Sequence, residues 1–425
     1  MRAGGRVVNA AGGNVATITS DGWRRSPAIA TFPAAMLTLL LNADLYAPES
    51  RGRQHLLLGG GRVLWIGAEA PALDAHLGVT EHDLGGRRVI PGLIDGHVHL
   101  TGGGGEAGYE TRVPPVPLTR FTSAGITTVV GVLGTDDVTR TPAALVATAR
   151  GLEAEGLSAW CHTGGYHYPP VTVTGSVRGD IVCLDRVIGV GEIALSDHRS
   201  SQLTLDELLK LAAEAHVGGL MTGKAGIVHL HLGDGARGTG LIEEVLRTAE
   251  IPARVFNPTH VNRRRALFEE ACALVGRGVT IDVTAFPVTD GEDAWSAPEA
   301  VEHYLAAGLP PERITVSSDG GGCLPVFDAE GRVREMDVGR PGALLEALGE
   351  LLARGHGLER ALPPFTSNVA RLLRLPRKGR LAAGMDADLV VLDEAGRPTD
   401  VMAGGRWHVT DRTAVVRGTF EGAEA

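Results

Sequence analysis

Cysteine is scarce in this chain of 425 residues, and its four cysteines, Cys161, Cys183, Cys272 and Cys323, show no paired spacing. Scattered thiols fit a reduced cytoplasm better than a disulfide framework, so we expect a cytoplasmic protein. Aromatic residues make up only 4% of the sequence, whereas aliphatic residues and glycines are abundant. This composition is typical of a globular α/β protein with many tight connections.

The chain also lacks a basic cluster and a long apolar run. Its formal net charge is -10 at pH 7, which argues against nucleic acid as a partner, because phosphates require concentrated lysine and arginine. No run of about 18 apolar residues is present, so we expect no membrane span. Arg24 and Arg25 before residues 29–41 imitate a signal sequence, but Pro33 interrupts the run. We therefore interpret residues 1–35 as a disordered extension.

One stretch organises the rest of the chain. Residues 91–100 form an apolar run that contains His97-Val98-His99, and four glycines follow at 102–105. Such a run predicts a strand with both histidines on one face. Two adjacent imidazoles are half of a metal site, although they are also compatible with two ordinary polar residues on a strand. The glycines favour the metal site, because backbone without a Cβ can pass close to a ligand.

Strand-like and helical segments alternate through the middle of the sequence. Apolar residues recur at spacings of three and four in the helical segments, for example at 205–216 and 264–275. The strand-like segments lie at 93–99, 127–132, 158–162, 187–193, 226–232, 253–257, 279–283 and 314–318. Eight such units predict a (β/α)8 TIM-like barrel over residues 91–375, with its chemistry at the carboxyl ends of the strands.

Short strand-like runs separated by turns occur at both ends of the chain. They lie at 37–45, 54–58, 62–66, 388–392, 406–409 and 414–416. We expect residues 36–90 and 376–425 to build one small β-sandwich domain.

Polar side chains stand at the predicted strand ends, which meet around one mouth in a barrel. They are His97, His99, Thr135, Cys161, His162, Glu192, His229, His231, His260 and Asp319. His231 lies nearer the mouth than His229, so we expect His231 to bind metal and His229 to fill the interior. Asp319 is suited to binding a metal and exchanging a proton with bound water, with a helix cap as the alternative.

These residues, together with the tail at 379–389, resemble the amidohydrolase superfamily. Within it, the segments at 102–112, 163–176, 196–199 and 258–263 resemble the isoaspartyl (β-aspartyl) dipeptidases. The similarity extends from about residue 36 to residue 420.

The resemblance implies hydrolysis of β-aspartyl dipeptides by a hydroxide that bridges two zinc ions, or other divalent first-row metals. It assigns His97, His99 and Asp319 to one metal and His231 and His260 to the other, with Asp319 also as general base and acid. The substrate would meet Tyr166 at its carbonyl oxygen, Glu106 at its ammonium, and Arg199 and Arg263 at its carboxylates, in a pocket lined by Gly104 and Thr135. The resemblance further implies a homo-oligomer that acts on a small dipeptide.

Two positions depart from that pattern. Glu192 stands at the end of strand four, where many such dipeptidases carry a carboxylated lysine, and none of the three lysines (Lys210, Lys224, Lys378) lies there. We expect Glu192 to bridge both metals, helped by a bulge at Gly191; the alternative is that it orients a histidine. Cys323 replaces an expected substrate-binding serine.

Two other functions remain compatible with the sequence. One is hydrolysis of a cyclic amide, as in dihydroorotases and hydantoinases, and the other is a metal-binding barrel without activity. Glu106, Arg199 and Arg263 argue against both, because together they match a substrate with charges at both ends.

Overall fold

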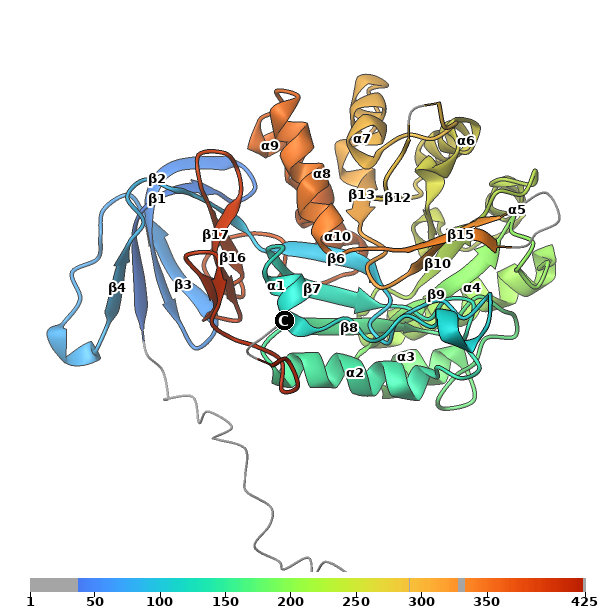
Figure 1. Cartoon of the computed structure of the whole chain (residues 1–425), viewed down its shortest axis with the longest axis horizontal. Coiled ribbons are helices and arrows are strands. Elements are labelled where there is room, and N and C mark those ends of the chain that lie inside the picture. The colour runs from blue at the N-terminus through green and yellow to red at the C-terminus, as the bar shows by residue number, and fades with distance from the viewer. Residues whose placement is uncertain (1–36, 290, 328–332, 423–425) are drawn as a thin grey trace, which may run out of the picture.

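The computed structural model describes residues 37–289, 291–327 and 333–422, so the predicted extension at 1–35 lies outside the described residues. A small β domain lies on one side, and a larger part of alternating strands and helices lies on the other (Figure 1). Strands from the beginning and the end of the chain lie side by side in the small domain. No helix within the described ranges is long and apolar enough to cross a membrane.

The small domain is one mixed sheet, in which nine strands are described in the order β19-β18-β17-β16-β5-β1-β2-β3, with β4 also paired to β1. Its strands are β1 (Thr38–Tyr46), β2 (Ser50–Gly59), β3 (Arg62–Gly67), β4 (Thr80–Asp83), β5 (Arg88–Pro91), β16 (Leu389–Leu392), β17 (Pro398–Ala403), β18 (Arg406–Thr410) and β19 (Thr413–Ala414). The antiparallel pairing of β5 with β16 joins the two ends of the chain. Leu40, Leu56, Val89, Leu389 and Met402 are among its buried core residues. The sandwich form and the domain boundaries stay predictions.

The larger part contains a curled parallel sheet. Six strands follow one another in it: β6 (Leu93–Val98), β7 (Ile126–Gly131), β8 (Ser158–Thr163), β9 (Val187–Leu195), β10 (Ile227–Leu232) and β11 (Phe256–Thr259). The parallel pair β12 (Ile281–Thr284) and β13 (Ile314–Ser317) continues it. The Thr259 hydroxyl donates to Asp282 at 2.7 Å across one gap, and the His99 amide donates to the Gly320 carbonyl at 2.9 Å across the other. These contacts are consistent with closure into a (β/α)8 barrel.

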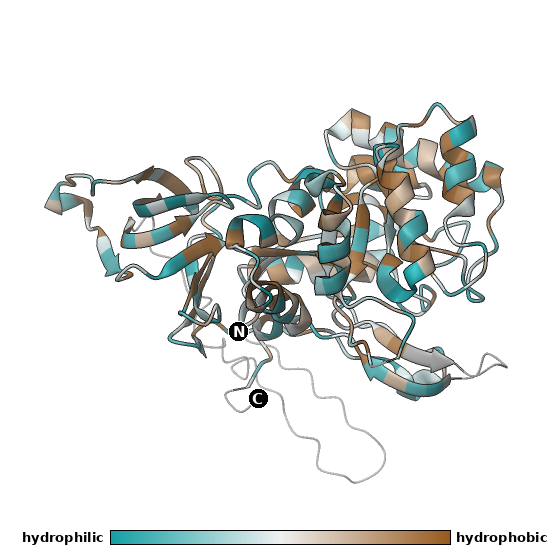
Figure 2. Cartoon of the chain, turned by 90° about the horizontal axis from the view of Figure 1, so that it is seen from above, coloured by the Kyte–Doolittle hydropathy of each residue, from teal (hydrophilic) through white to brown (hydrophobic). Residues whose placement is uncertain are grey.

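Helices cover the outside of this sheet (Figure 1). They are α1 (Leu118–Thr122), α2 (Pro142–Ala154), α3 (Val177–Cys183), α4 (Leu205–Thr222), α5 (Gly240–Thr248), α6 (Arg265–Val275), α7 (Ala297–Ala306), α8 (Gly342–Ala353), α9 (Leu358–Ala361) and α10 (Ser367–Leu372). The six described 3-10 turns are η1 (Ala75–Leu77), η2 (Tyr109–Thr111), η3 (Ala253–Val255), η4 (Val261–Arg263), η5 (Pro311–Arg313) and η6 (Pro363–Phe365). Figure 2 shows hydrophilic and hydrophobic residues interleaved along these helices.

Helix α4 illustrates how sequence determines these elements. Thr204 and Glu207 form a reciprocal capping box that satisfies free amides at its first turn. Leu208, Leu211 and Ala215 recur at helical spacing and are buried, so the helix packs through one apolar face.

Several segments differ from the sequence-based prediction, among them strands β4, β5 and β17 of the small domain, which it did not include. The strand predicted at 253–257 begins only at Phe256, because Val255 donates its amide back to the Pro252 carbonyl and closes the turn η3. The hairpin of β14 (Cys323–Phe327) and β15 (Val333–Val338) was not predicted.

Candidate active site

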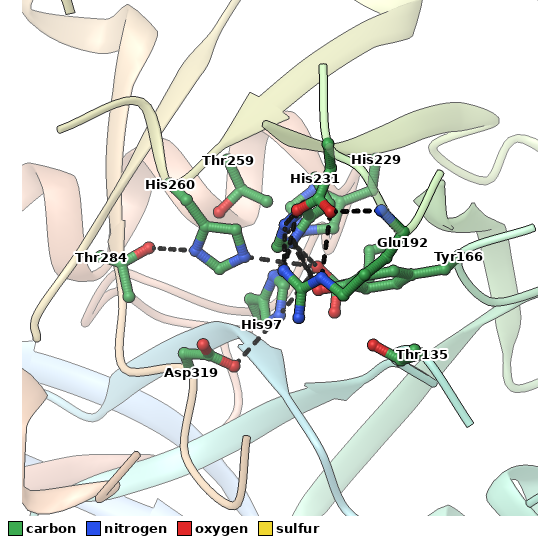
Figure 3. Close-up of polar contacts among 12 residues, drawn as sticks. His97, Thr135, Tyr166, Glu192, His229, His231, Thr259, His260, Thr284 and Asp319 are labelled. Atoms are coloured by element: carbon green, nitrogen blue, oxygen red, sulfur yellow. Dashed lines mark hydrogen bonds and ion pairs between the residues drawn. The ribbon is translucent and has the colours of Figure 1, made fainter. Parts of the chain in front are cut away.

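Six side chains from five strand ends converge at the carboxyl edge of the curled sheet. His97 and His99 come from the end of β6, Glu192 from β9, His231 from β10, His260 from the residue after β11, and Asp319 from the loop after β13. All six are buried. Figure 3 shows five of them pointing toward one another. The structure therefore brings together every metal ligand predicted from the sequence.

Glu192 lies between the two groups of histidines. One carboxylate oxygen, Oε2, is 3.1 Å from His231 Nδ1 and 3.3 Å from His260 Nε2. The other, Oε1, is 3.3 Å from His99 Nε2. Asp319 Oδ1 closes the opposite side, at 3.4 Å from His97 and 3.1 Å from His99. Oε2 also lies 3.6 Å from His97 Nε2, so Glu192 contacts histidines of both groups.

A β-bulge aims Glu192 into this position. In the pairing of β9 with β10, Val190 lies opposite Val228 and Ile193 lies opposite Leu230, so two residues of β9 oppose one of β10. Those two residues are Gly191 and Glu192, which confirms the predicted bulge. A Cβ at Gly191 would lie 2.7 Å from the Cβ of His229, so only glycine fits.

The donor set fits divalent metal ions. Its nitrogen and oxygen atoms gather within 4.8 Å of one another in three groups, which are His97 with His260 and Asp319, His97 with His99 and Glu192, and Glu192 with His231 and His260. His97 Nε2 and Asp319 Oδ1 are buried and lack a hydrogen-bond partner among the described residues. Imidazole and carboxylate are the ligands that zinc and its first-row neighbours prefer.

Both carboxylates of this cluster are anions. Burial by itself raises the pKa of Asp319, but the adjacent His97 and His99 rings outweigh it and hold that pKa below its usual range. Burial likewise raises the pKa of Glu192, but the adjacent His97, His231 and His260 rings outweigh it and hold that pKa well below its usual range. Two anions among four imidazoles form a site that a divalent cation complements.

Asp197 is a site residue that the sequence analysis missed. Its Oδ2 lies 3.1 Å from His231 Nε2 and accepts a hydrogen bond of 2.8 Å from Arg199. Asp197 thus joins a metal-ligand histidine to a predicted substrate-binding arginine. Asp197 could have been found from the sequence, because it lies two residues after β9 and inside the segment 196–199 that carries the family resemblance.

Tyr166 follows β8, and its hydroxyl lies 2.8 Å from His231 Nδ1 (Figure 3). Burial raises the pKa of Tyr166, helped by the negative charge of Glu192. The phenol therefore keeps its proton, as a hydrogen-bond donor to a developing oxyanion must.

A cavity of about 650 Å³ opens above the ligand cluster. Its lining includes every predicted substrate-binding residue: Gly104, Glu106, Thr135, Tyr166, Arg199, Arg263 and Cys323. It also includes residues that the sequence analysis did not single out: Asp197, His198, Asp234, Arg264, Phe286, Pro287, Glu292, Asp293 and Leu324.

Charged groups in this cavity have unused hydrogen-bonding capacity. Glu106 Oε1 accepts from Thr135 at 3.0 Å, but its buried Oε2 has no hydrogen-bond partner in the part of the chain that the structure describes. The buried Nε of Arg263 likewise has none there. A buried carboxylate oxygen and a buried guanidinium nitrogen favour a ligand that supplies the complementary groups.

Other polar residues near the strand ends lie outside the ligand cluster. His229 is buried behind His97, and His162 stacks on His229 with ring centroids 5.4 Å apart. Lys224 donates to the carbonyls of Ile181 and Leu184 instead of approaching Glu192.

Residues 88–408 match the model of the amidohydrolase family. The β-aspartyl dipeptidase of Fervidobacterium islandicum AW-1, in complex with β-Asp-Leu dipeptide, superposes with a TM-score of 0.84 at 40% identity and covers 89% of this chain and 98% of its own. A second structure of a β-aspartyl dipeptidase from that organism gives 0.81 at 38% identity, with the same coverage. An imidazolonepropionase of Ruegeria sp. is 25% identical over 85% of this chain and 93% of its own length. D-hydantoinase from Thermus sp., at 17% identity and TM-score 0.62, covers 90% of this chain and 97% of its own and shares the fold.

Proposed function

The chain belongs to the amidohydrolase family and groups there with the β-aspartyl dipeptidases, and on that premise we propose that it is a zinc-dependent hydrolase of β-aspartyl dipeptides. The observation that carries the proposal is the charge pattern of the cavity. Among the described residues Glu106 Oε2 has no hydrogen-bond partner, and the guanidinium groups of Arg199, which also pairs with Asp197 and Glu106, and of Arg263 line the same cavity. A β-aspartyl dipeptide carries one ammonium and two carboxylates, so each charge has a counterpart.

The proposed metal centre uses the six buried side chains. His97, His99 and Asp319 would hold one zinc ion, His231 and His260 the other, and Glu192 both, in keeping with its contacts to histidines of both groups. When bound, the metals would lower the pKa of a water molecule and polarise the amide carbonyl.

The protein's own residues perform the remaining steps. Asp319 accepts the proton of the attacking water and delivers it to the leaving nitrogen as the carbon–nitrogen bond breaks. The Tyr166 hydroxyl donates to the carbonyl oxygen while negative charge develops there. Glu106, Arg199 and Arg263 hold the ends of the dipeptide, so the β-amide, and not an α-amide, lies over the ligand cluster.

Location and assembly are also proposals. The four cysteines are free thiols, which supports a cytoplasmic enzyme. We expect a homo-oligomer, as the family resemblance implies.

The test is an assay of purified protein with β-Asp-Leu and α-Asp-Leu, with the metal content measured in the same sample. We expect β-Asp-Leu to be hydrolysed with a kcat/KM at least about 100-fold above that for α-Asp-Leu, since a misplaced charged end leaves an ion unpaired in the cavity. A chelator should abolish the activity, and zinc should restore it. Equal hydrolysis of the two isomers would refute the proposal.

A second candidate is cyclic-amide hydrolysis, which the similarity to an imidazolonepropionase favours. Imidazolonepropionate carries a carboxylate but no ammonium, so it would leave the buried Oε2 of Glu106 without a hydrogen-bond donor. Including this compound in the same assay separates the two functions.

A further inference from the structure

The four ligand histidines differ in what holds the ring nitrogen on the side away from the metal centre. His231 meets Asp197 there, and His260 Nδ1 lies 2.8 Å from the Thr284 hydroxyl. His99 Nδ1 has no hydrogen-bond partner among the described residues. His97 stands at the end of a series of hydrogen bonds that reaches the backbone carbonyl of Thr280, the residue before β12.

This series consists of three hydrogen bonds between buried residues. The amide nitrogen of Asn257 donates to the Thr280 carbonyl at 2.8 Å. The amide oxygen of Asn257 lies 2.7 Å from His229 Nδ1. His229 Nε2 lies 2.8 Å from His97 Nδ1.

The carbonyl at the far end determines the direction of every link. Because a carbonyl only accepts, Asn257 must point its NH2 group at Thr280, and its oxygen must face His229. His229 Nδ1 therefore carries the proton and donates to Asn257. In a neutral ring this leaves His229 Nε2 as an acceptor, so His97 donates from Nδ1 and keeps a lone pair on Nε2.

The alternative, a doubly protonated His229, is disfavoured by its surroundings. His229 is 2% exposed and packs between His97 and the stacked ring of His162. No ion pair to His229 occurs within the described residues, and a buried charge without a counterion is costly.

We propose that His229 and Asn257 are positioning residues that lock His97 in its Nδ1–H tautomer and present its Nε2 to the metal. The proposal rests on the metal dependence in the proposed function and is independent of the substrate. It assigns a role to His229 beyond the interior packing expected from the sequence. Partners of this kind change metal affinity by about 10- to 100-fold in other sites.

The experiment measures zinc affinity by competition with a chromogenic chelator, metal content per chain, and the melting temperature of the metal-free protein. His229→Phe removes the acceptor but keeps a ring against His162, and it should weaken zinc binding about 10- to 100-fold. His229→Gln offers a carbonyl oxygen to His97 Nδ1 and should retain affinity within about fivefold. Asn257→Leu, which leaves His229 free to change tautomer, should give an intermediate loss.

His162→Phe is the matched control, because it keeps the stack on His229 and neither ring nitrogen of His162 has a hydrogen-bond partner in the described chain. We expect wild-type zinc affinity from it. A His229→Phe protein that melts like wild type without metal and binds zinc equally well would overturn the proposal, as would equal losses in His229→Phe and His162→Phe. If His229→Phe does not fold, the same comparison is made with Asn257→Leu.

The readout also separates this proposal from the proposed function. A loss of zinc affinity in His229→Phe, rescued in His229→Gln, supports the proposal even in a protein that leaves β-Asp-Leu intact. Wild-type protein that binds no divalent metal would overturn the proposal and the metal part of the function together.

Discussion

Two regions of the cavity are built differently. The floor, which we define as His97, His99, Glu192, His231, His260 and Asp319, lies within three residues of strand ends and is buried. The rim, which we define as Glu106, Arg199, Arg263 and Cys323, lies on the segments that follow the strands. Strand ends are fixed by the sheet, whereas these segments are free to vary. We therefore propose that the floor determines whether hydrolysis occurs and the rim determines which substrate is hydrolysed.

Removing the proton acceptor of the floor should have the largest effect. Asp319→Asn keeps the size of the side chain but cannot accept and return a proton, so kcat for β-Asp-Leu should fall by about 10³-fold or more at saturating zinc. KM should change little, because the rim is intact. A kcat within tenfold of wild type, in protein with a full metal content, would show that another group moves the proton.

Removing the shared ligand should affect the metal content as well as the rate. Glu192→Ala leaves two cations without the anion that screens their repulsion, so we expect about one metal per chain instead of two, and a loss of kcat of about 10²-fold or more. Elemental analysis and steady-state kinetics check this. Wild-type protein should also regain activity with zinc in buffer free of carbon dioxide.

Two results would contradict the bridging role of Glu192. Retention of both metals in Glu192→Ala would mean that this carboxylate only orients histidines. If reconstitution of the wild type strictly required bicarbonate, the metal centre would depend on a carboxylated side chain, and Glu192 would not be its bridging anion.

A rim substitution should change selectivity and leave the floor intact. Arg263→Met leaves a substrate carboxylate unpaired, so kcat/KM for β-Asp-Leu should fall about 100-fold, or roughly 3 kcal/mol, with unchanged metal content. Arg264→Met is the matched control, since Arg264 also lines the cavity but donates to the Gly235 carbonyl. A similar loss in both variants would indicate a general effect of positive charge.

The sequence predicted the residues of the floor better than the hydrogen bonds that hold them in place. His97 and His99 share a strand face, and barrel geometry brings distant strand ends to one mouth, so residue position predicted a shared mouth and the family resemblance selected the ligands there. Even the reach of Glu192 was predictable, because Gly191 indicated a bulge.

The features that sequence did not predict depend on side-chain conformation or on loops. Asp197 follows a strand as many capping aspartates do, and only the fold places it between His231 and Arg199. The same holds for the links from Thr280 through Asn257 and His229 to His97, which join residues from four segments of the sheet. The β14–β15 hairpin pairs short runs without a strong alternation of apolar residues.

The smallest effect is expected at Cys323, the rim residue that departs most from the family resemblance. Burial, helped by the negative charges of Glu106 and Asp319, raises the pKa of its thiol to about 12. The thiol is therefore neutral at pH 7 and unsuited to nucleophilic attack. As a donor to a substrate carboxylate it is weaker than a hydroxyl, so Cys323→Ser should keep kcat within about twofold and leave KM for β-Asp-Leu unchanged or lowered by about threefold. Steady-state kinetics with β-Asp-Leu, together with melting curves, distinguish this role from simple packing. A large loss of melting temperature with unchanged KM would show that Cys323 supports the β14 strand and does not contact substrate, and the rim would then consist of charged residues alone.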